Sequence, residues 1–331
     1  MRTLVVRIAS LKITLLGIVG IIIVALATYR NPEFGTVWLA VPLAVLAVNL
    51  LAAILTNGAF RQQSALLVFH VCLLAVILLI AVGLLIRFDG HVELVEGEAF
   101  DAYAVEIVRK GALHRFVLDK VNFVQGRITV DYRPGLIRHN TRSNVIEVGT
   151  NGQTQEIGDG NSVTFGSYRF NTTFNKGWAV ILRWSGDKGI VQRGSVNFPS
   201  YPEFEWKQAN EWTTPGGEHL ALELRLNPVP GDSDWVLKSG ESEFSLVISD
   251  ARLGTHELKP GQSIRMTHGT LTVEELRLWM GYRIDFDPLL PWVFAAAMLA
   301  LIALAVHFQL KFRAAVPAGR TSAIGATYVC D

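Results

Sequence analysis

Long, unbroken runs of apolar residues occur in two parts of the chain, in about the first 86 residues and again near the C-terminal end. The first part contains runs at 13–29, 36–55 and 64–86, and the second contains one at 289–310. Each run is close to the roughly 20 residues that a helix needs to cross about 30 Å of hydrocarbon. The pattern therefore predicts four transmembrane helices. No small-residue cleavage site follows the first run, which favours a retained helix over a secretory signal.

The sequence between 87 and 288 has a different pattern, in which short runs with β-branched residues are separated by Gly, Asn, Asp and Pro. GRITVDY, LALELRL and GTLTVEEL alternate with period two, as strands with one wet face do. The pairs Asn151-Gly152 and Gly158-Asp159 are typical of hairpin turns. We expect an all-β domain over 87–288, a sandwich or an open barrel, that buries its own core. Its aromatic core residues would include Trp178, Trp184, Trp206 and Phe244.

One segment of this region, from about Phe198 to Glu218, contains three prolines, which argue against regular sheet. We expect a loop that folds back on the β domain. The alternative is a contact surface for a partner or a hydrophobic cofactor, made from the segment's aromatic residues Tyr201, Phe204, Trp206 and Trp212.

The 30 Lys and Arg residues nearly balance the 29 Asp and Glu residues in this 331-residue chain, so nucleic acid is not an expected partner. With four spans, the basic residues of the short flanks all fall on one side of the membrane: Arg2, Arg7, Lys12, Arg61, Lys311, Arg313 and Arg320. The positive-inside rule then predicts that both termini are cytoplasmic. The β domain would be extracytoplasmic, and 311–331 would form a short cytoplasmic tail.

Few sequence features indicate chemistry in this chain. Its two cysteines, Cys72 and Cys330, form no CxxC, CxxCH or zinc-type spacing, which excludes thiol–disulfide chemistry and covalent haem attachment to this chain. No GxSxG, HExxH, Walker A or GxGxxG element occurs. Histidines 91, 114, 139, 219, 256 and 268 are scattered through the β region, and we expect surface or packing roles for them.

The two histidines inside predicted spans, His70 and His307, are the strongest candidates for a function. A polar ring in hydrocarbon is costly and is usually retained for a hydrogen bond, a proton path or a ligand. Both lie in the predicted cytoplasmic leaflet, where neutral imidazoles can bind haem iron axially. His70 has only apolar neighbours within a turn, which favours a functional role. His307 lies close to Lys311, so the simpler interpretation is an interfacial residue that reaches water.

The order of parts, together with several local stretches, resembles the ResB (CcsB) family of system II cytochrome c biogenesis. The stretches are RIASLKITLLGIVG, LAVNLLAAIL, LLVFHVCLLAVILLIAVGLLIRFDGHVELVEGEAF, TRSNVIEVGTNGQTQEIGDGNSVTFGSYRFNTTF and GYRIDFDPLLPWVFAAAMLAL. The resemblance covers most of the chain, although the soluble domain and the tail are shorter than in the family. It implies that His70 matches the third-span histidine that ligates haem b. His307 is a weaker candidate ligand, from its position in the fourth span alone.

The resemblance also implies partners. The protein would work in a bacterial-type cytoplasmic or thylakoid-like membrane with a CcsA/CcsC-type polytopic protein, moving haem across the bilayer for attachment to apocytochrome c. It would have no catalytic activity alone and would be part of a holocytochrome c synthase complex. The alternative class is a non-catalytic membrane scaffold or assembly subunit of a respiratory or cytochrome complex. A sensor ranks last, because only about 20 residues follow Lys311 and leave no room for a cytoplasmic output domain.

Overall fold

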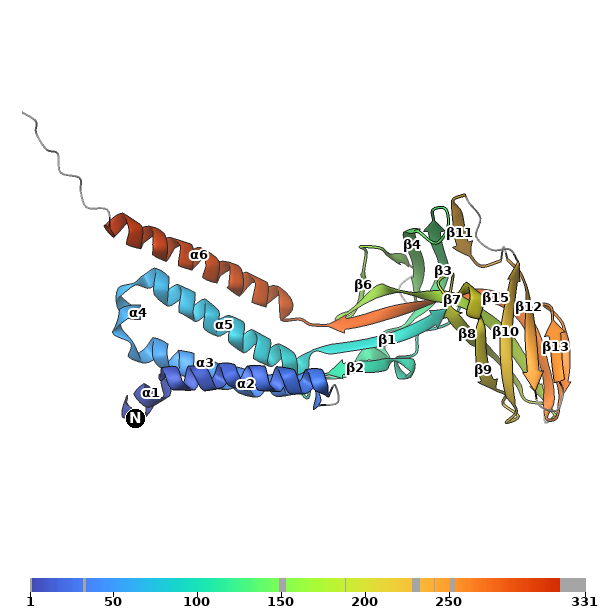
Figure 1. Cartoon of the computed structure of the whole chain (residues 1–331), viewed down its shortest axis with the longest axis horizontal. Helices are drawn as coiled ribbons and strands as arrows, with labels where there is room; N and C mark the ends of the chain where they lie inside the picture. The colour runs from blue at the N-terminus through green and yellow to red at the C-terminus, as the bar shows by residue number, and fades with distance from the viewer. Residues whose placement is uncertain are drawn as a thin grey trace, which may run out of the picture. The chain divides into compact units, whose positions relative to one another are not determined.

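The structure, a computed structural model, describes residues 2–31, 34–148, 153–187, 189–227, 233–240, 242–250 and 254–315. Asn151-Gly152, Cys330 and the part of the tail after Ala315 lie outside these residues. The chain divides into two compact units (Figure 1). The helical unit comprises Met1–Arg87, Gly111–His114 and Asp287–Asp331, and the β unit comprises Phe88–Lys110 and Arg115–Phe286.

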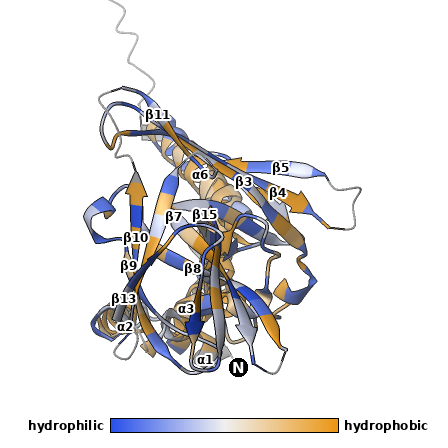
Figure 2. Cartoon of the chain, turned by 90° about the vertical axis from the view of Figure 1, so that its right-hand side faces the viewer, coloured by the Kyte–Doolittle hydropathy of each residue, from blue (hydrophilic) through white to orange (hydrophobic). Residues whose placement is uncertain are grey.

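Four helices of the helical unit are long and apolar enough to cross a membrane, as predicted: Leu11–Arg30, Thr36–Thr56, Ser64–Ile86 and Leu290–Arg313. The helical elements are α1 (Arg2–Ile8), α2 (Leu11–Arg30), η2 (Thr36–Leu39), α3 (Ala40–Thr56), α4 (Gly58–Gln62), α5 (Ser64–Ile86) and α6 (Leu290–Ala315). Figure 2 shows α6 coloured as mainly apolar. The chain is therefore a multi-pass membrane protein by length and composition, and its fourth apolar helix lies after the β region.

Small residues bring the first two spans together. An added Cβ at Gly17 of α2 would lie 2.5 Å from Leu46 of α3, and one at Gly20 would lie 3.2 Å from Pro42. Close approach of backbones through glycine is a common way for membrane helices to pack. Helix α3 in turn contacts α5, and α5 contacts α6.

A buried amide closes the junction between α1 and α2. Asn49 of α3 is only 5% exposed and donates through Nδ2 to the carbonyl oxygens of Ile8 (2.6 Å) and Ser10 (3.0 Å). Thr14 donates its hydroxyl hydrogen to Oδ1 of Asn49 at 2.8 Å. In hydrocarbon, backbone groups released by a helix break need such partners. Asn49 thus has a structural explanation, which the sequence pattern did not indicate.

The short loop Gly111–His114 belongs to the helical unit, although it lies between two segments of the β unit in the sequence, and it covers the end of α5. The amides of Gly111 and Leu113 donate to the carbonyl oxygens of Arg87 (2.9 Å) and Leu85 (2.7 Å). Nδ1 of His114, a buried residue, lies 2.7 Å from the carbonyl oxygen of Ile86. The last carbonyls of a helix have no partner within the helix, so this loop supplies the hydrogen-bond donors that α5 lacks.

The β unit is built from antiparallel strands in three sheets, which confirms an all-β region (Figure 1). The strands are β1 (Phe88–Val95), β2 (Glu106–Lys110), β3 (Phe123–Tyr132), β4 (Arg138–Glu147), β5 (Thr154–Gly158), β6 (Val163–Phe165), β7 (Tyr168–Gly186), β8 (Val191–Ser200), β9 (Ala209–Thr213), β10 (His219–Asn227), β11 (Trp235–Lys238), β12 (Glu243–Asp250), β13 (Gly254–Leu258), β14 (Ser263–Met266) and β15 (Gly269–Phe286).

The largest sheet has the order β2-β1-β15-β7-β6, with β14 beside β15 and β8 beside β7. The other two have the orders β13-β12-β10-β9 and β11-β3-β4-β5. The first strand of the unit, β1, pairs along its whole length with the end of the last strand, β15. The pairing runs from Phe88 opposite Phe286 to Val95 opposite Trp279. The unit therefore begins and ends at neighbouring positions of one sheet.

The core of the β unit is aromatic and aliphatic. Phe123 stacks on Phe100 and Phe165, with ring centroids 5.1 Å and 4.6 Å apart, and meets Phe170 edge-on. Trp178 and Trp184 are buried and Phe244 is partly buried, as expected. The prediction for Trp206 is wrong, because this residue is 77% exposed on the 3-10 turn Glu205–Lys207.

The segment 198–218 is more regular than its prolines suggested. Strand β9 lies within it and pairs with β10, from Ala209 opposite Glu223 to Thr213 opposite His219. Pro199 lies near the end of β8. Four of the five side chains of β9 are exposed, so its sequence lacks the apolar alternation that would have indicated a strand.

A polar network is buried between the largest sheet and β3. Tyr282, on β15, is fully buried and donates to Oε1 of Gln125 at 2.7 Å, and its hydroxyl also meets that of Ser143. Gln125 donates through Nε2 to Ser143 at 2.8 Å. Burial raises the pKa of Tyr282 well above its ordinary value, although both hydrogen bonds act in the opposite direction. The phenol is therefore neutral and able to donate throughout the physiological range.

Candidate functional site in the third apolar helix

His70 lies near the start of α5 and has a defined ring orientation. Its Nδ1 is 2.8 Å from the carbonyl oxygen of Leu66, one helical turn earlier. A carbonyl oxygen can only accept, so the hydrogen of the neutral ring is on Nδ1, and Nε2 carries the lone pair. Among the residues that the structure describes, Nε2 has no hydrogen-bond partner.

Two phenylalanine rings pack against the imidazole. The ring centroid of Phe60 lies 4.4 Å from that of His70 at an interplanar angle of 52°, and Phe69 meets it edge-on at 5.0 Å. Phe60 is buried and comes from α4, whose first turn is capped by Asn57 accepting a hydrogen bond from Ala59 N at 3.0 Å. The hydrogen bond to Leu66 and these two rings together restrict rotation of the imidazole.

This arrangement fits one axial ligand of a metalloporphyrin. Metal-binding histidines usually donate the hydrogen of the other ring nitrogen to a carboxylate or a backbone carbonyl, which fixes the tautomer and the ring plane. His70 does so through Leu66. Neutral imidazole nitrogen is also the common protein ligand of haem iron.

His307 lies near the end of α6, where it is partly exposed and its ring centroid is 5.6 Å from that of Phe308. No hydrogen bond or ring contact joins it to His70 within the described chain. The two histidines therefore do not touch each other directly in the described residues, although the helices that carry them, α5 and α6, pack together. Cys72 is a partly buried free thiol on α5.

The other histidines of the sequence form no metal site. In the described residues, no group of three or more His, Cys, Asp and Glu side chains is arranged to hold a metal ion. His91, His139, His219, His256 and His268 are exposed, and His114 belongs to the loop that covers α5. The predicted surface and packing roles agree with these positions.

Sequence reasoning missed Phe60, which supplies the closest ring contact of His70. Phe60 precedes the third apolar run and lies in a five-residue helix, so no periodic pattern indicates where its ring points. The break between α4 and α5 at Gln63 brings it back over His70.

Comparison with known proteins does not identify the chain: no protein-family model matches it, and no curated protein matches it.

Proposed function

We propose that this chain is a membrane component of system II cytochrome c maturation that helps to move haem across the bilayer and to present it for covalent attachment. The observation that carries the proposal is His70, an imidazole in a span, with Nδ1 bonded to Leu66 and no hydrogen-bond partner for Nε2 among the described residues. The resemblance of most of the chain to the ResB (CcsB) family supports the same function.

In this proposal, haem is the cargo, and its iron accepts an axial nitrogen ligand while it is held. His70 supplies one ligand from the cytoplasmic leaflet. The second ligand is His307 or a histidine of a CcsA/CcsC-type partner, and we favour the partner, because His307 lies close to Lys311 and is explained as an interfacial residue. Phe60 and Phe69 keep the His70 ring in one orientation as cargo arrives.

The β unit has the partner-facing role. It lies outside the cytoplasm of a bacterial-type or thylakoid-like membrane, with both termini inside. There it braces the partner and holds apocytochrome c close to the haem vinyl groups. Arg87 at the end of α5 donates to Thr36 at the start of the second span, at 2.5 Å, which supports opposite directions for these two spans.

Purification of the chain together with its partner tests the proposal. We expect reduced spectra of the wild-type complex to show bound haem. His70→Ala should lose most of it, whereas His307→Ala, the matched control in another span, should keep it. The amount of partner that copurifies serves as a check on assembly. Equal haem content in the wild-type and His70→Ala complexes would contradict the ligand assignment.

The second candidate is a scaffold or assembly subunit that binds no haem. It is equally compatible with a sequence that contains no GxSxG, HExxH, Walker A or GxGxxG element. This function predicts a stable wild-type complex with no haem spectrum, and disruption of the complex without any spectral change when the β unit is altered.

A further inference from the structure

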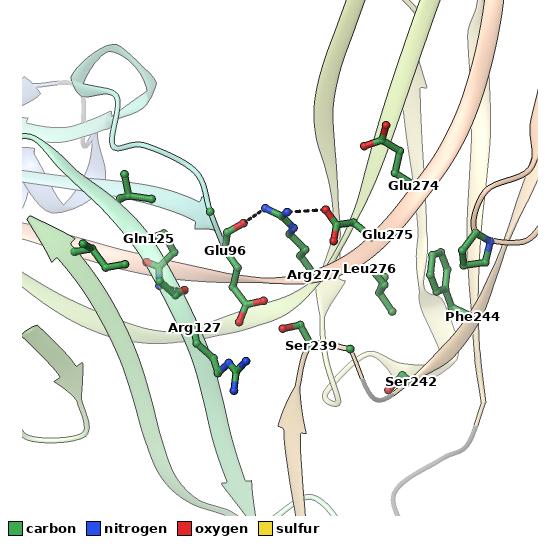
Figure 3. A pocket seen from close by; sticks show the side chains of 16 residues that line it. Glu96, Gln125, Arg127, Ser239, Ser242, Phe244, Glu274, Glu275, Leu276 and Arg277 are labelled. Carbon is green, nitrogen blue, oxygen red and sulfur yellow. Dashed lines mark hydrogen bonds and ion pairs between the residues drawn. The ribbon is translucent and has the colours of Figure 1, made fainter. Parts of the chain in front are cut away.

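The β unit contains a cleft of about 690 Å³ that the proposed function does not use (Figure 3). All three sheets contribute to its lining. Strand β3 supplies Val124–Arg127, β15 supplies Glu274–Arg277, and β12 supplies Phe244. Ser239 and Ser242, in the connection between β11 and β12, complete one side. A volume in this range is typical of sites for small ligands.

Two strand irregularities open into this cleft. The pairing of β3 with β4 shifts between Gln125 and Ile128, and the pairing of β15 with β7 shifts between Val273 and Glu275. The extra residues Gly126, Arg127 and Glu274 all line the cleft. Bulges redirect side chains and are frequent next to binding sites. Two bulges from different sheets thus turn charged side chains toward one space.

The carboxylates of the cleft already have partners. Glu274 pairs with Arg183 (3.2 Å) and Arg193 (2.6 Å). Glu275 pairs with Arg193 and Arg277, each at 2.6 Å. Arg277 also donates to the backbone oxygen of Glu96, as the dashed lines in Figure 3 show. Glu96 is buried, with 8% of the residue exposed, and its carboxylate accepts from Ile128 N at 2.7 Å.

Arg127 differs from these residues. It is exposed, and it makes no ion pair or hydrogen bond with the residues that the structure describes. Within the same described part of the chain, the hydroxyls of Ser239 and Ser242 also have no partner. Arg183, Arg193 and Arg277 pair with the carboxylates of Glu274 and Glu275, and the carboxylate of Glu96 accepts from a backbone amide. In the described part of the cleft, the guanidinium of Arg127 and the two serine hydroxyls are therefore the donors that remain for a ligand, and a guanidinium suits an anion.

Apolar side chains, here called the apolar wall, form another part of the lining. They are Val124, Ile146, Phe244 and Leu276, of which Ile146 is 38% exposed. A guanidinium fork matches the two oxygens of a carboxylate, and hydrogen bonds to charged groups are the stronger ones. We infer that the cleft binds a ligand that carries a carboxylate on an apolar body, with the carboxylate on Arg127 and the body against this wall.

This site is independent of haem binding at His70, so it is tested without haem. The full chain in nanodiscs is titrated with 2-naphthoate and with neutral 2-naphthamide, which has a similar shape, and binding is followed by ligand-observed NMR. Empty nanodiscs correct for partition into lipid. We expect the wild type to bind naphthoate at least tenfold more tightly than naphthamide.

Arg127→Leu should weaken naphthoate binding at least tenfold and abolish the preference over naphthamide. The control is Arg133→Leu, which removes another exposed arginine that lies outside the cleft and should leave both affinities unchanged. Ser239→Trp, which places a large ring at the cleft, should weaken both ligands. The inference is overturned if naphthoate shows no preference over naphthamide, or if Arg127→Leu and Arg133→Leu behave alike.

Discussion

Lys176 is a buried charged residue of the β unit, and its ion-pair partner Glu203 is exposed. Its side chain is 1% exposed, whereas that of Glu203, 2.8 Å from Nζ, is 45% exposed. The ammonium also donates to the carbonyl oxygen of Phe174 at 3.1 Å and lies 5.7 Å from the ring centroid of Tyr132. A buried charge that loses its partner is costly, even where the pair itself adds little stability.

Glu203→Gln keeps an oxygen acceptor for the ammonium but removes the negative charge that compensates it. It should therefore lower the free energy of unfolding by about 1–3 kcal/mol, the range for hydrogen bonds to charged groups. Tryptophan fluorescence during denaturant unfolding measures the change. The control is Glu223→Gln, which breaks the exposed pair between Glu223 and Arg225 and should change stability little. Equal effects of the two substitutions would show that Lys176 finds another partner.

Tyr282 gives a prediction about alkaline pH. Burial raises its pKa in the folded state above the ordinary value of 10.0. A raised folded pKa provides stability that is fully present below the unfolded pKa and is lost as pH rises through the folded pKa. The free energy of unfolding should thus fall above about pH 10.

Tyr282→Phe should remove the part of the fall in unfolding free energy above pH 10 that comes from ionisation of this phenol. At neutral pH it should also cost about 1–3 kcal/mol, because Gln125 and Ser143 lose a buried partner. Unfolding measured at neutral pH and again above pH 10 separates the two effects. A Tyr282→Phe protein with the full wild-type slope above pH 10 would contradict the assignment to this phenol.

At the level of elements, the loop 111–114 can pack on the end of α5 only because residue 111 is a glycine. A Cβ at Gly111 would lie 2.2 Å from the carbonyl oxygen of Leu85 and 2.7 Å from the amide nitrogen of Ile86. Both are backbone atoms of α5, so they cannot turn aside as a flexible side chain would. Any side chain at this position must displace the loop from the end of α5.

Gly111→Ala should expose the amides of Gly111 and Leu113, whose acceptors are carbonyls of this helix. Hydrogen exchange measures this directly, and we expect both amides to exchange at least tenfold faster. Gly194→Ala in β8 is the control, since an added Cβ there meets nothing within 4 Å. Unchanged exchange in Gly111→Ala would show that the loop shifts without losing its bonds.

The elements show where sequence reasoning works. Apolar runs predicted the four long helices because crossing hydrocarbon sets a minimum length that other elements rarely reach. Alternation predicted β3 and β10 because buried side chains alternate there with more exposed ones. Strand β9 was missed because its side chains are mostly exposed. The helix break at Ser10 was also missed, since it depends on Asn49 from another span.

In the candidate site, too, the feature with a local sequence signal was predicted and the feature that depends on tertiary structure was not. His70 was identifiable because a histidine among apolar residues stands out locally. Phe60 was not, since its contact with His70 depends on a turn between two helices. The cleft in the β unit was also invisible, because it needs bulges in β3 and β15 to come together across sheets.

For the whole molecule, the sidedness of the β unit is the main prediction. In a Cys72→Ser background, a cysteine placed at exposed Glu211 should react with a membrane-impermeant maleimide in intact cells. The native Cys330 should react only after the cells are permeabilised, which provides an internal control in the same chain. The reverse pattern would contradict cytoplasmic termini.

The pairing of β1 with β15 has a consequence for how the protein can be divided. Phe88 and Phe286 face each other across one pair of strands, about 5 Å apart. A fragment cut at these two residues would keep every strand of the β unit and begin and end side by side. The remaining membrane helices could be rejoined by a linker of a few residues. The β unit is thus an insertion in the chain of the helical unit, and the loop 111–114 is the one part of that insertion that belongs with the helices.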